Sequence, residues 1–238
     1  MNHGNGRVAD RVADRVVNRV AGLYAVTPDE ADTDRLLAMV AAALEGGAML
    51  VQYRNKSASE SLRAEQAMRL ARLCDEHGRR LIVNDHVDLA MTIANAGLHV
   101  GIDDANDLQA LRERLGPSRI LGVSCYADLD RAKQAAAAGA DYVAFGSVFP
   151  SSTKPAAVRA SLELFAQARE LNIALVGIGG IDASNLRRLV DAGADAAAVI
   201  TDLFDVSEVA AIRTRATALA RCFGDAGRAC RPASTDPQ

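Results

Sequence analysis

The chain has 238 residues, with 27 lysines and arginines against 30 aspartates and glutamates, and a formal net charge of −3 at pH 7. Proteins that bind nucleic acid or an anionic membrane need an excess of positive charge, so this balance argues against both roles. No apolar run reaches the roughly 18 residues of a membrane span, and the N-terminus has no apolar stretch typical of a secretory signal. We therefore expect a cytoplasmic globular protein.

Two terminal segments differ in composition from the rest of the chain. Residues 1–21 contain the near-repeat RVAD-RVAD-RVVN-RVA and are expected to be a helical or disordered extension. Residues 223–238 are small, polar and proline-containing, which predicts a disordered tail. Residues 22–222 are predicted to form one catalytic domain.

Short apolar runs alternate with longer stretches rich in alanine, leucine and arginine over this domain. The runs are too short for helices and are bounded by glycine, proline, aspartate or asparagine, which predicts β-strands. The eight predicted strands are Leu23–Thr27, Met49–Arg54, Leu81–Asp85, Gly97–Gly101, Ile120–Cys125, Tyr142–Val148, Ala174–Gly180 and Ala196–Asp202.

The stretches between the strands carry helix start and stop signals. The first is predicted to open at Thr33, to place Leu36, Val40 and Leu44 on one apolar face, and to stop at Gly46. Further helices are expected after Ser59, Asp128 and Asp182. The phrases AGADYVAF and AGADAAAV lie 54 positions apart, and each is typical of a helix end followed by a buried strand.

Strict alternation of strands and helices predicts parallel strands with right-handed crossovers. Eight such units favour an α/β fold of the closed (β/α)₈ type, the TIM barrel. A doubly wound open sheet is the alternative, but no G-x-G-x-x-G follows the first strand. In a barrel the functional groups lie at the C-terminal ends of the strands.

The end of the second predicted strand places Gln52, Arg54 and Lys56 at alternate positions, which face one side of an extended chain. Gln52 would offer an amide to a heterocycle, and the two cations would bind an oxyanion such as pyrophosphate. The alternative is three solvated loop residues. Only three lysines occur beside 24 arginines, and two of them, Lys56 and Lys154, follow predicted strands.

Two aspartates, Asp85 and Asp104, follow the third and fourth predicted strands. Two carboxylates near a cationic loop suit Mg²⁺, which binds one or two carboxylates together with water and phosphate oxygens. A general acid/base pair is the rival interpretation. Helix N-capping is the other alternative, with Asp104 capping the helix that contains Leu108 and Leu111.

The loops after the last three predicted strands have the character of an anion site. The Gly177–Gly180 turn and Ile200-Thr201 follow strands whose loops often bind phosphate in barrels. From the sixth strand, Ser151, Thr153 and Lys154 could close over an anion. His99 lies inside the fourth strand, where a satisfied core or supporting residue is expected rather than a catalytic one.

Together these segments resemble the thiamine-phosphate synthase family over roughly residues 22–220. The motifs that carry the resemblance, in chain order, are LYAVTPD (23–29), VQYRNK (51–56), IVND (82–85), LHVGIDD (98–104), GVS (122–124), FGSVFPSSTK (145–154) and VGIGGI (176–181).

The resemblance implies a (β/α)₈ transferase that joins a hydroxymethylpyrimidine diphosphate to a thiazole phosphate and releases pyrophosphate. It implies Mg²⁺ bound by Asp85 and Asp104, and catalytic roles for Arg54, Lys56 and Lys154. The implied substrate-binding residues are Gln52, Arg54, Lys56, Asn84 and Ser124 for the pyrimidine diphosphate and Ser151, Thr153, Lys154, Gly180, Ile200 and Thr201 for the thiazole phosphate. Tyr53, Asn55 and Ser152 are expected to bind substrate as well.

The expected partners are therefore small molecules, with neither nucleic acid nor membrane, and a homo-oligomer is left open. Two rival functions remain. A thiazole tautomerase of the same fold would be an isomerase with a phosphate site, but it would not need the cations after the second strand. A barrel without catalysis that senses thiamine precursors is the other.

Overall fold

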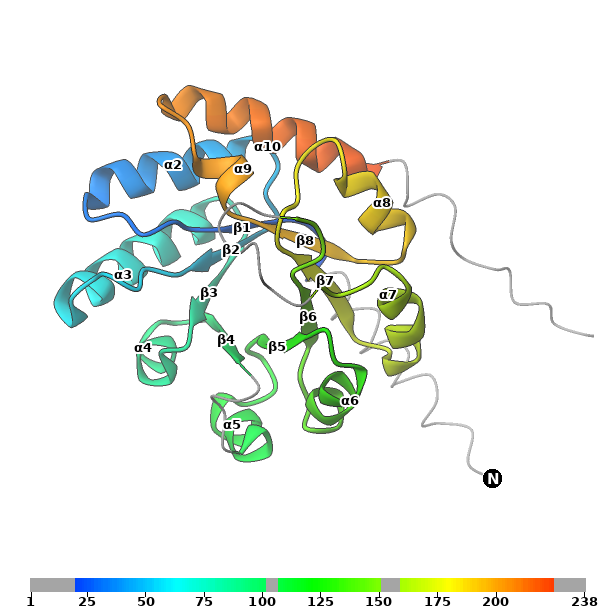
Figure 1. Cartoon of the computed structure of the whole chain (residues 1–238). Coiled ribbons are helices and arrows are strands. Elements are labelled where there is room, and N and C mark those ends of the chain that lie inside the picture. The colour runs from blue at the N-terminus through cyan, green and yellow to red at the C-terminus, as the bar shows by residue number, and fades with distance from the viewer. Residues whose placement is uncertain (1–19, 102–106, 151–158, 225–238) are drawn as a thin grey trace, which may run out of the picture.

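A computed structural model describes residues 20–101, 107–150 and 159–224 of the chain. Eight parallel strands form a closed barrel in which each strand pairs with its neighbours in the sequence, and β1 pairs with β8 to close the ring (Figure 1). The strands are β1 (Gly22–Val26), β2 (Leu50–Tyr53), β3 (Arg80–Asn84), β4 (Gly97–Gly101), β5 (Leu121–Tyr126), β6 (Tyr142–Gly146), β7 (Ala174–Ile178) and β8 (Ala196–Val199). The predicted (β/α)₈ class is confirmed.

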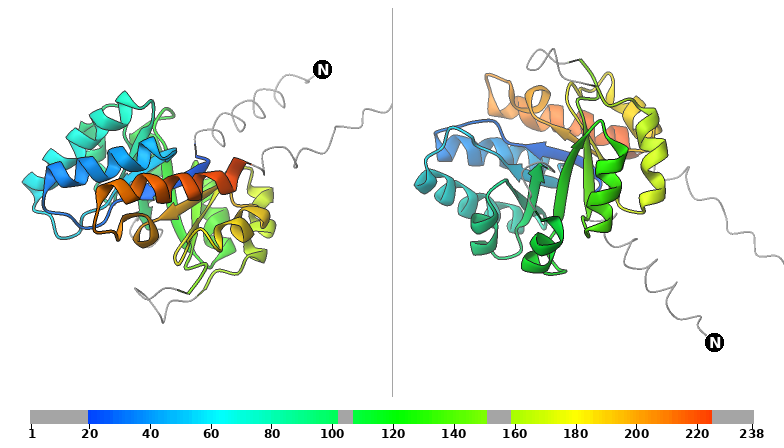
Figure 2. Two further views of the ribbon diagram at one scale, coloured as in Figure 1. Left: turned by 90° about the horizontal axis from the view of Figure 1, so that it is seen from above. Right: turned by 60° about the horizontal axis from the view of Figure 1, so that its bottom comes forward.

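Helices surround the barrel on the outside (Figure 2). They are α2 (Thr33–Glu45), α3 (Glu60–Glu76), α4 (Val87–Thr92), α5 (Leu108–Leu115), α6 (Leu129–Ala137), α7 (Glu163–Ala168) with the 3₁₀ turn η1 (Arg169–Leu171), α8 (Leu186–Asp191), α9 (Thr201–Phe204) and α10 (Val209–Gly224). Across the described residues, no helix is long and apolar enough to cross a membrane.

Side-chain caps explain where several helices begin. The Asp32 carboxylate accepts hydrogen bonds from two backbone N–H groups in the first turn of α2. Ser59 caps α3 and Asp128 caps α6 in the same way, as the sequence predicts. These short polar side chains satisfy N–H groups that have no partner within the helix.

The predicted strands are all present and begin within one residue of the predicted positions, and the larger differences lie at the C-terminal ends of the last three strands. β7 stops at Ile178 because Gly179 and Gly180 have φ angles of 98° and 65°, which a strand cannot continue. β8 stops at Val199, and Thr201 already begins α9. The last predicted residues of the seventh strand therefore lie in the turn after β7, and Thr201 and Asp202 of the eighth belong to α9.

Two apolar regions form the core. One lies between the barrel and the helices, where Phe145 and Phe165 meet edge to face at 5.4 Å. The other fills the barrel interior and includes Leu50, Ile82 and Ile120. The interior also holds buried polar side chains, among them Gln52 and His99, which belong to the site described below.

The N-terminal ends of the strands are fastened by charged side chains. Asp141, in the first AGAD phrase, accepts a hydrogen bond from Leu121 N at 2.7 Å and pairs with Arg112 at 3.1 Å. Asp195, in the second phrase, accepts from Leu175 N at 2.8 Å. In both units the carboxylate just before one strand therefore accepts from the backbone at the start of the preceding strand, at its first residue in β5 and its second in β7. This shared role explains why the AGAD phrase occurs twice in the sequence.

Helix α10 packs beside α2 and covers the seam between β1 and β8 (Figure 1). Gly46, after α2, allows this contact, because a Cβ there would lie 2.4 Å from Ala216 Cβ. α10 ends at Gly224, two residues into the segment predicted as a tail. The structure leaves the rest of that tail and the expected extension at 1–19 outside its described residues.

Candidate active site

The C-terminal ends of the strands gather most of the predicted site residues that the structure describes. Gln52, Asn84 and Ser124 lie on or at the end of three different strands around one rim, as the barrel topology requires. Five further predicted residues, Asp104, Ser151, Ser152, Thr153 and Lys154, lie outside the described residues.

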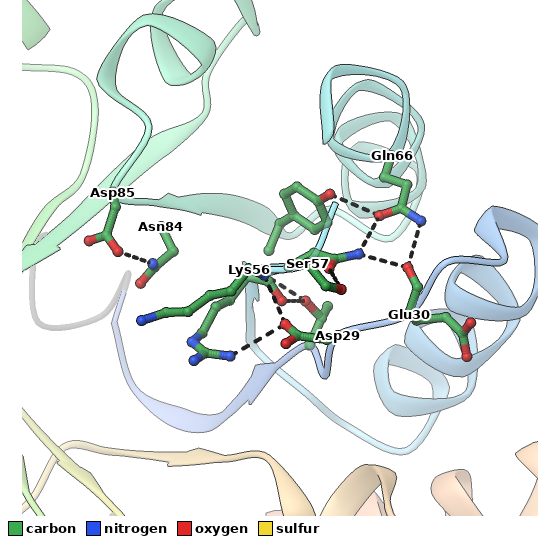
Figure 3. A network of polar contacts seen from close by, with 11 residues as sticks. Asp29, Glu30, Lys56, Ser57, Gln66, Asn84 and Asp85 are labelled. Carbon is green, nitrogen blue, oxygen red and sulfur yellow. Dashed lines mark hydrogen bonds and ion pairs between the residues drawn. The ribbon is translucent and has the colours of Figure 1, made fainter. Parts of the chain in front are cut away.

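The segment after β2 is organised by Asp29, a residue that the sequence did not single out as functional. Its carboxylate accepts a hydrogen bond from Lys56 N at 2.8 Å and lies 3.6 Å from Arg54 Nη1. Thr27 Oγ1 accepts a bond from Arg54 N and donates to Arg54 O. The backbone that carries both cations is thus tied to the loop after β1, and the exposed Lys56 side chain extends toward Asn84 and Asp85 (Figure 3).

Tyr53 and Asn55 turn to the opposite side. The Tyr53 hydroxyl donates to Gln66 Oε1 at 2.8 Å, and Asn55 Nδ2 donates to Glu30 O at 2.7 Å. Gln66 Nε2 donates to the same carbonyl at 3.0 Å, and burial raises the pKa of Tyr53 to about 12. The structure does not bring these two predicted residues to the barrel mouth; they fasten the β2 loop to α3.

Asp85 lies exposed at the end of β3 with an unusual backbone conformation. Its φ of 61° is rare for an aspartate, and its N–H donates to His99 O on β4 at 2.8 Å. Asn84 Nδ2 donates to Asp85 Oδ2 at 2.6 Å, so the carboxylate is oriented by a neighbouring amide (Figure 3). Asp85 is therefore held in place by local contacts while remaining accessible.

Helix capping, the alternative for both aspartates, is wrong. The N-cap position of α4 is His86, and Asp85 makes no capping bond there. The N-cap of α5 is Asp107, whose side chain accepts from Ala110 N at 2.9 Å. Three aspartates occur within residues 103–107, and the helix begins after the last of them, so Asp104 is not needed as a cap.

The turn after β7 packs tightly against the segment after β6. Val148 N donates to Ile178 O and Phe149 N to Gly179 O, both at 3.0 Å. A Cβ on Gly180 would lie 2.3 Å from Pro150 O, so only glycine fits. The Gly180 carbonyl accepts from Asn185 Nδ2 at 2.8 Å, which fixes the turn from its other side.

Ile200 and Thr201 stand next to this turn in the ring, between β8 and α9. Ile200 is the N-cap residue of α9, and Thr201 is exposed. The backbone of the β7 turn and that of the α9 start therefore lie on neighbouring strands of the same rim, as the phosphate-site expectation requires.

A chain of polar side chains crosses the barrel interior, from Gln52 near the end of β2 to Ser124 on β5. Gln52 Nε2 donates to the Tyr24 hydroxyl at 2.9 Å, and the hydroxyls of Tyr24 and Tyr142 are 2.8 Å apart. The Tyr142 hydroxyl lies 2.9 Å from His99 Nδ1, and His99 Nε2 lies 2.9 Å from Ser124 Oγ. We refer to these five residues as the interior chain.

Burial sets the protonation of the interior chain. It lowers the pKa of His99 to about 4 and raises the pKa values of both tyrosines well above their usual range. His99 is the satisfied core residue that the sequence predicts. Tyr24 and Tyr142 were not predicted, although their positions in strands that must line a barrel interior were the available signal.

Comparisons with known proteins show which family the sequence matches. Residues 23–203 match the model of a family described as thiamine monophosphate synthase. A thiamine-phosphate synthase of Chromobacterium violaceum is 54% identical over 203 residues, covering 85% of this chain and 96% of that protein. One of Methylobacillus flagellatus is 52% identical over 190 residues, covering 80% and 90%.

A solved structure agrees. A thiamine phosphate pyrophosphorylase from Pyrococcus furiosus superimposes with a TM-score of 0.75 at 30% identity, covering 89% of this chain and 98% of that one. The fold and the rim thus define a (β/α)₈ transferase of thiamine biosynthesis. The chain belongs to the thiamine monophosphate synthase family, and its role is the synthesis of thiamine phosphate.

Proposed function

We propose that the chain condenses 4-amino-2-methyl-5-(diphosphooxymethyl)pyrimidine with 4-methyl-5-(2-phosphooxyethyl)thiazole to thiamine phosphate and pyrophosphate. The bond from the pyrimidine methylene to the diphosphate oxygen breaks, and the thiazole nitrogen forms the new C–N bond. The electron-rich aminopyrimidine stabilises the cationic carbon between these events. No nucleophilic side chain is required, so the protein must bind, orient and neutralise charge.

The observation that carries this proposal is the arc formed by the ends of β2 and β3. These two strands pair with each other, and β2 carries an amide and two cations (Gln52, Arg54 and Lys56) to this arc. β3 carries the Asp85 carboxylate, toward which the Lys56 side chain extends (Figure 3). We assign the Gln52 amide to the pyrimidine ring, and Arg54 and Lys56 to the diphosphate, whose negative charge increases as it leaves. Asn84 and Ser124, on the same rim, would contact the same substrate.

Asp85 fits a magnesium site. Its carboxylate is an exposed hard oxygen donor at the rim, oriented by Asn84 and free of a capping role. The described residues contain no cluster of three or more metal-binding side chains, and Mg²⁺ does not need one, since it takes one or two carboxylates with water and phosphate oxygens. Asp85 and Asp104 would hold the ion. Bound there, Mg²⁺ would neutralise charge on the diphosphate leaving group.

The thiazole phosphate is assigned to the opposite arc. The β7 turn at Gly180 and the Ile200-Thr201 backbone lie on adjacent strands, a location where barrels often bind phosphate. Ser151, Ser152, Thr153 and Lys154, assigned by resemblance, follow the segment that packs on this turn. The turn and this segment would hold the second substrate so that its nitrogen faces the pyrimidine carbon.

The test mixes both substrates with the protein and follows thiamine phosphate and pyrophosphate. We expect equal amounts of the two products with Mg²⁺ and loss of turnover with EDTA. Isomerisation of a thiazole that is unaffected by EDTA would identify a tautomerase instead. Binding of both substrates without product would identify a sensor. A cytoplasmic location stays a prediction.

A further inference from the structure

We propose that the interior chain is a one-way series of hydrogen bonds in which neutral His99, with its proton on Nε2, fixes Ser124 as an acceptor and so directs the Ser124 proton to the bound diphosphate. His99 is then a positioning residue for the reaction, because it acts through Ser124. This inference rests on the proposed function for the identity of the anion at the mouth.

The direction of the chain follows from counting protons. The Gln52 amide nitrogen can only donate, so the Tyr24 oxygen accepts from it at 2.9 Å. A buried phenol proton needs an acceptor, and of the two described partners of Tyr24 only the Tyr142 oxygen, 2.8 Å away, can accept it, so Tyr24 donates to Tyr142. Tyr142, having accepted from Tyr24, donates in turn to His99 Nδ1 at 2.9 Å.

The same count fixes the histidine tautomer. A ring nitrogen that accepts a hydrogen bond has no proton, so Nδ1 of His99 is bare. With Nδ1 bare, the ring carries its single proton on Nε2. Nε2 then donates to Ser124 Oγ at 2.9 Å.

Ser124 ends the chain at the mouth with one proton left to donate. Its Oγ is occupied as an acceptor by His99, and the residue is only partly buried, whereas the other four members of the interior chain are at most 8% exposed. A hydroxyl in this state is suited to an acceptor-only ligand such as a diphosphate oxygen. A hydroxyl free to rotate would lose part of this preference.

The packing of the barrel interior holds the rings of the interior chain in place. The Tyr142 ring lies where a side chain on residue 122 would be, because a Cβ on Gly122 would come within 1.9 Å of the Tyr142 ring. The rings of His99 and Tyr142 stack at 5.6 Å, and the Tyr24 ring meets that of Tyr142 edge to face at 6.0 Å. The rings are therefore held in the geometry that the hydrogen bonds need.

The first test reads the tautomer directly. In protein labelled with ¹⁵N-histidine, long-range ¹H–¹⁵N spectra at pH 7 should show one buried ring with a protonated Nε2 and a bare Nδ1, and this signal set should vanish in His99→Gln. A His99 ring with its proton on Nδ1, or with both nitrogens protonated, would overturn the proposal. This measurement does not depend on which reaction the protein catalyses.

The second test separates positioning from packing by two variants at one position. His99→Gln can place an amide N–H near the Nε2 position, whereas the shorter side chain of His99→Asn can meet Tyr142 but not Ser124. We expect His99→Asn to raise KM for the pyrimidine diphosphate about tenfold, the scale of one hydrogen bond to a charged group. KM for the thiazole phosphate should change less than about twofold, and His99→Gln should restore most of the loss.

Ser124→Ala supplies the control background. There, His99→Asn should add no further loss, because the group that it positions is gone. Equal losses in the two His99 variants, or a full additional loss on top of Ser124→Ala, would leave His99 a packing residue and refute the proposal. If the unmodified protein makes no thiamine phosphate from the mixed substrates, the proposed function fails, while the tautomer result still decides the direction of the chain.

Discussion

The two ends of the barrel use charged residues in opposite ways. At the N-terminal ends of the strands, Asp141 and Arg119 bind the protein's own backbone and are largely satisfied. At the C-terminal ends, the side chains of Lys56 and Asp85 are exposed, and hydrogen bonds hold only the backbone of these two residues in place. Charge at the first end contributes stability, and charge at the second is left for ligands, so variants at the two ends should separate stability from activity.

The largest expected effect is at the N-terminal end. Asp141→Ala removes the acceptor for Leu121 N and leaves Arg112 without its carboxylate, in a pair whose side chains are 10% and 18% exposed. We expect the free energy of unfolding to fall by about 3 kcal/mol, measured by urea denaturation. Asp141→Asn, which keeps an acceptor oxygen, should lose less. The turnover of the folded fraction should be unchanged, and a comparable loss of kcat would contradict the separation.

The next largest expected effect is a pH dependence of the free energy of unfolding that comes from His99. Between pH 6.5 and about 4, His99 of the unfolded chain takes up a proton that the folded protein excludes. Stability is therefore lost as the pH falls through this window, by about 3 kcal/mol from this residue. Urea denaturation at pH 7 and pH 4 measures the loss. In His99→Gln this component should be missing, and identical pH profiles for the two proteins would refute it.

A similar effect, but on rate, is expected for Lys56→Ala. Turnover should fall about 10²-fold, because one electrostatic contact to the leaving group is lost, while the thermal unfolding midpoint stays nearly unchanged. Lys133→Ala is the matched control: that lysine lies on α6 and pairs with Asp130 at 2.9 Å. Its rate should remain within about twofold of the original, since nothing at the rim is altered. Similar rates in the two variants would reject the role of Lys56.

The smallest expected effect comes from comparing two arginines, the backbone-bound Arg119 and the exposed Arg114. Arg119 Nη1 donates to the carbonyls of Ala90, Ile93 and Ala96 at 2.8, 2.8 and 3.0 Å. Arg119→Met should cost about 2 kcal/mol of unfolding free energy in urea. Arg114→Met, which breaks an exposed ion pair with Asp88, should cost less than about 0.5 kcal/mol. Equal costs would mean that the three carbonyl bonds contribute little.

The sequence predicted the barrel because its signals are local. Eight buried runs between helix signals determine the topology, and the rule for parallel barrels then places Gln52 and Asp85 at one rim. The alternation that puts Gln52 and Arg54 on one side also puts Tyr53 on the other, so its structural role could have been predicted. The cap of α5 could not, because Asp103, Asp104 and Asp107 offer the same chemistry within one turn.

The interior chain could not be predicted from the sequence, for a different reason. A tyrosine in a strand has the pattern of an apolar residue, and nothing in LYAV or DYVAF shows that two hydroxyls 118 residues apart will meet. Their meeting depends on barrel closure and on the space left by Gly122. Residues that act through long-range packing need coordinates to be found.

The closure of the ring by β1 and β8 also has a consequence for how the protein is made. β1 is synthesised first and finds its second partner only when β8 follows, about 170 residues later. At 5–20 residues per second, a ribosome needs roughly 10–35 s to cover that distance. For that time the nascent chain has an open strand edge, which favours pairing with other chains. We expect it to be most vulnerable to aggregation on the ribosome just before α10 emerges to cover the seam.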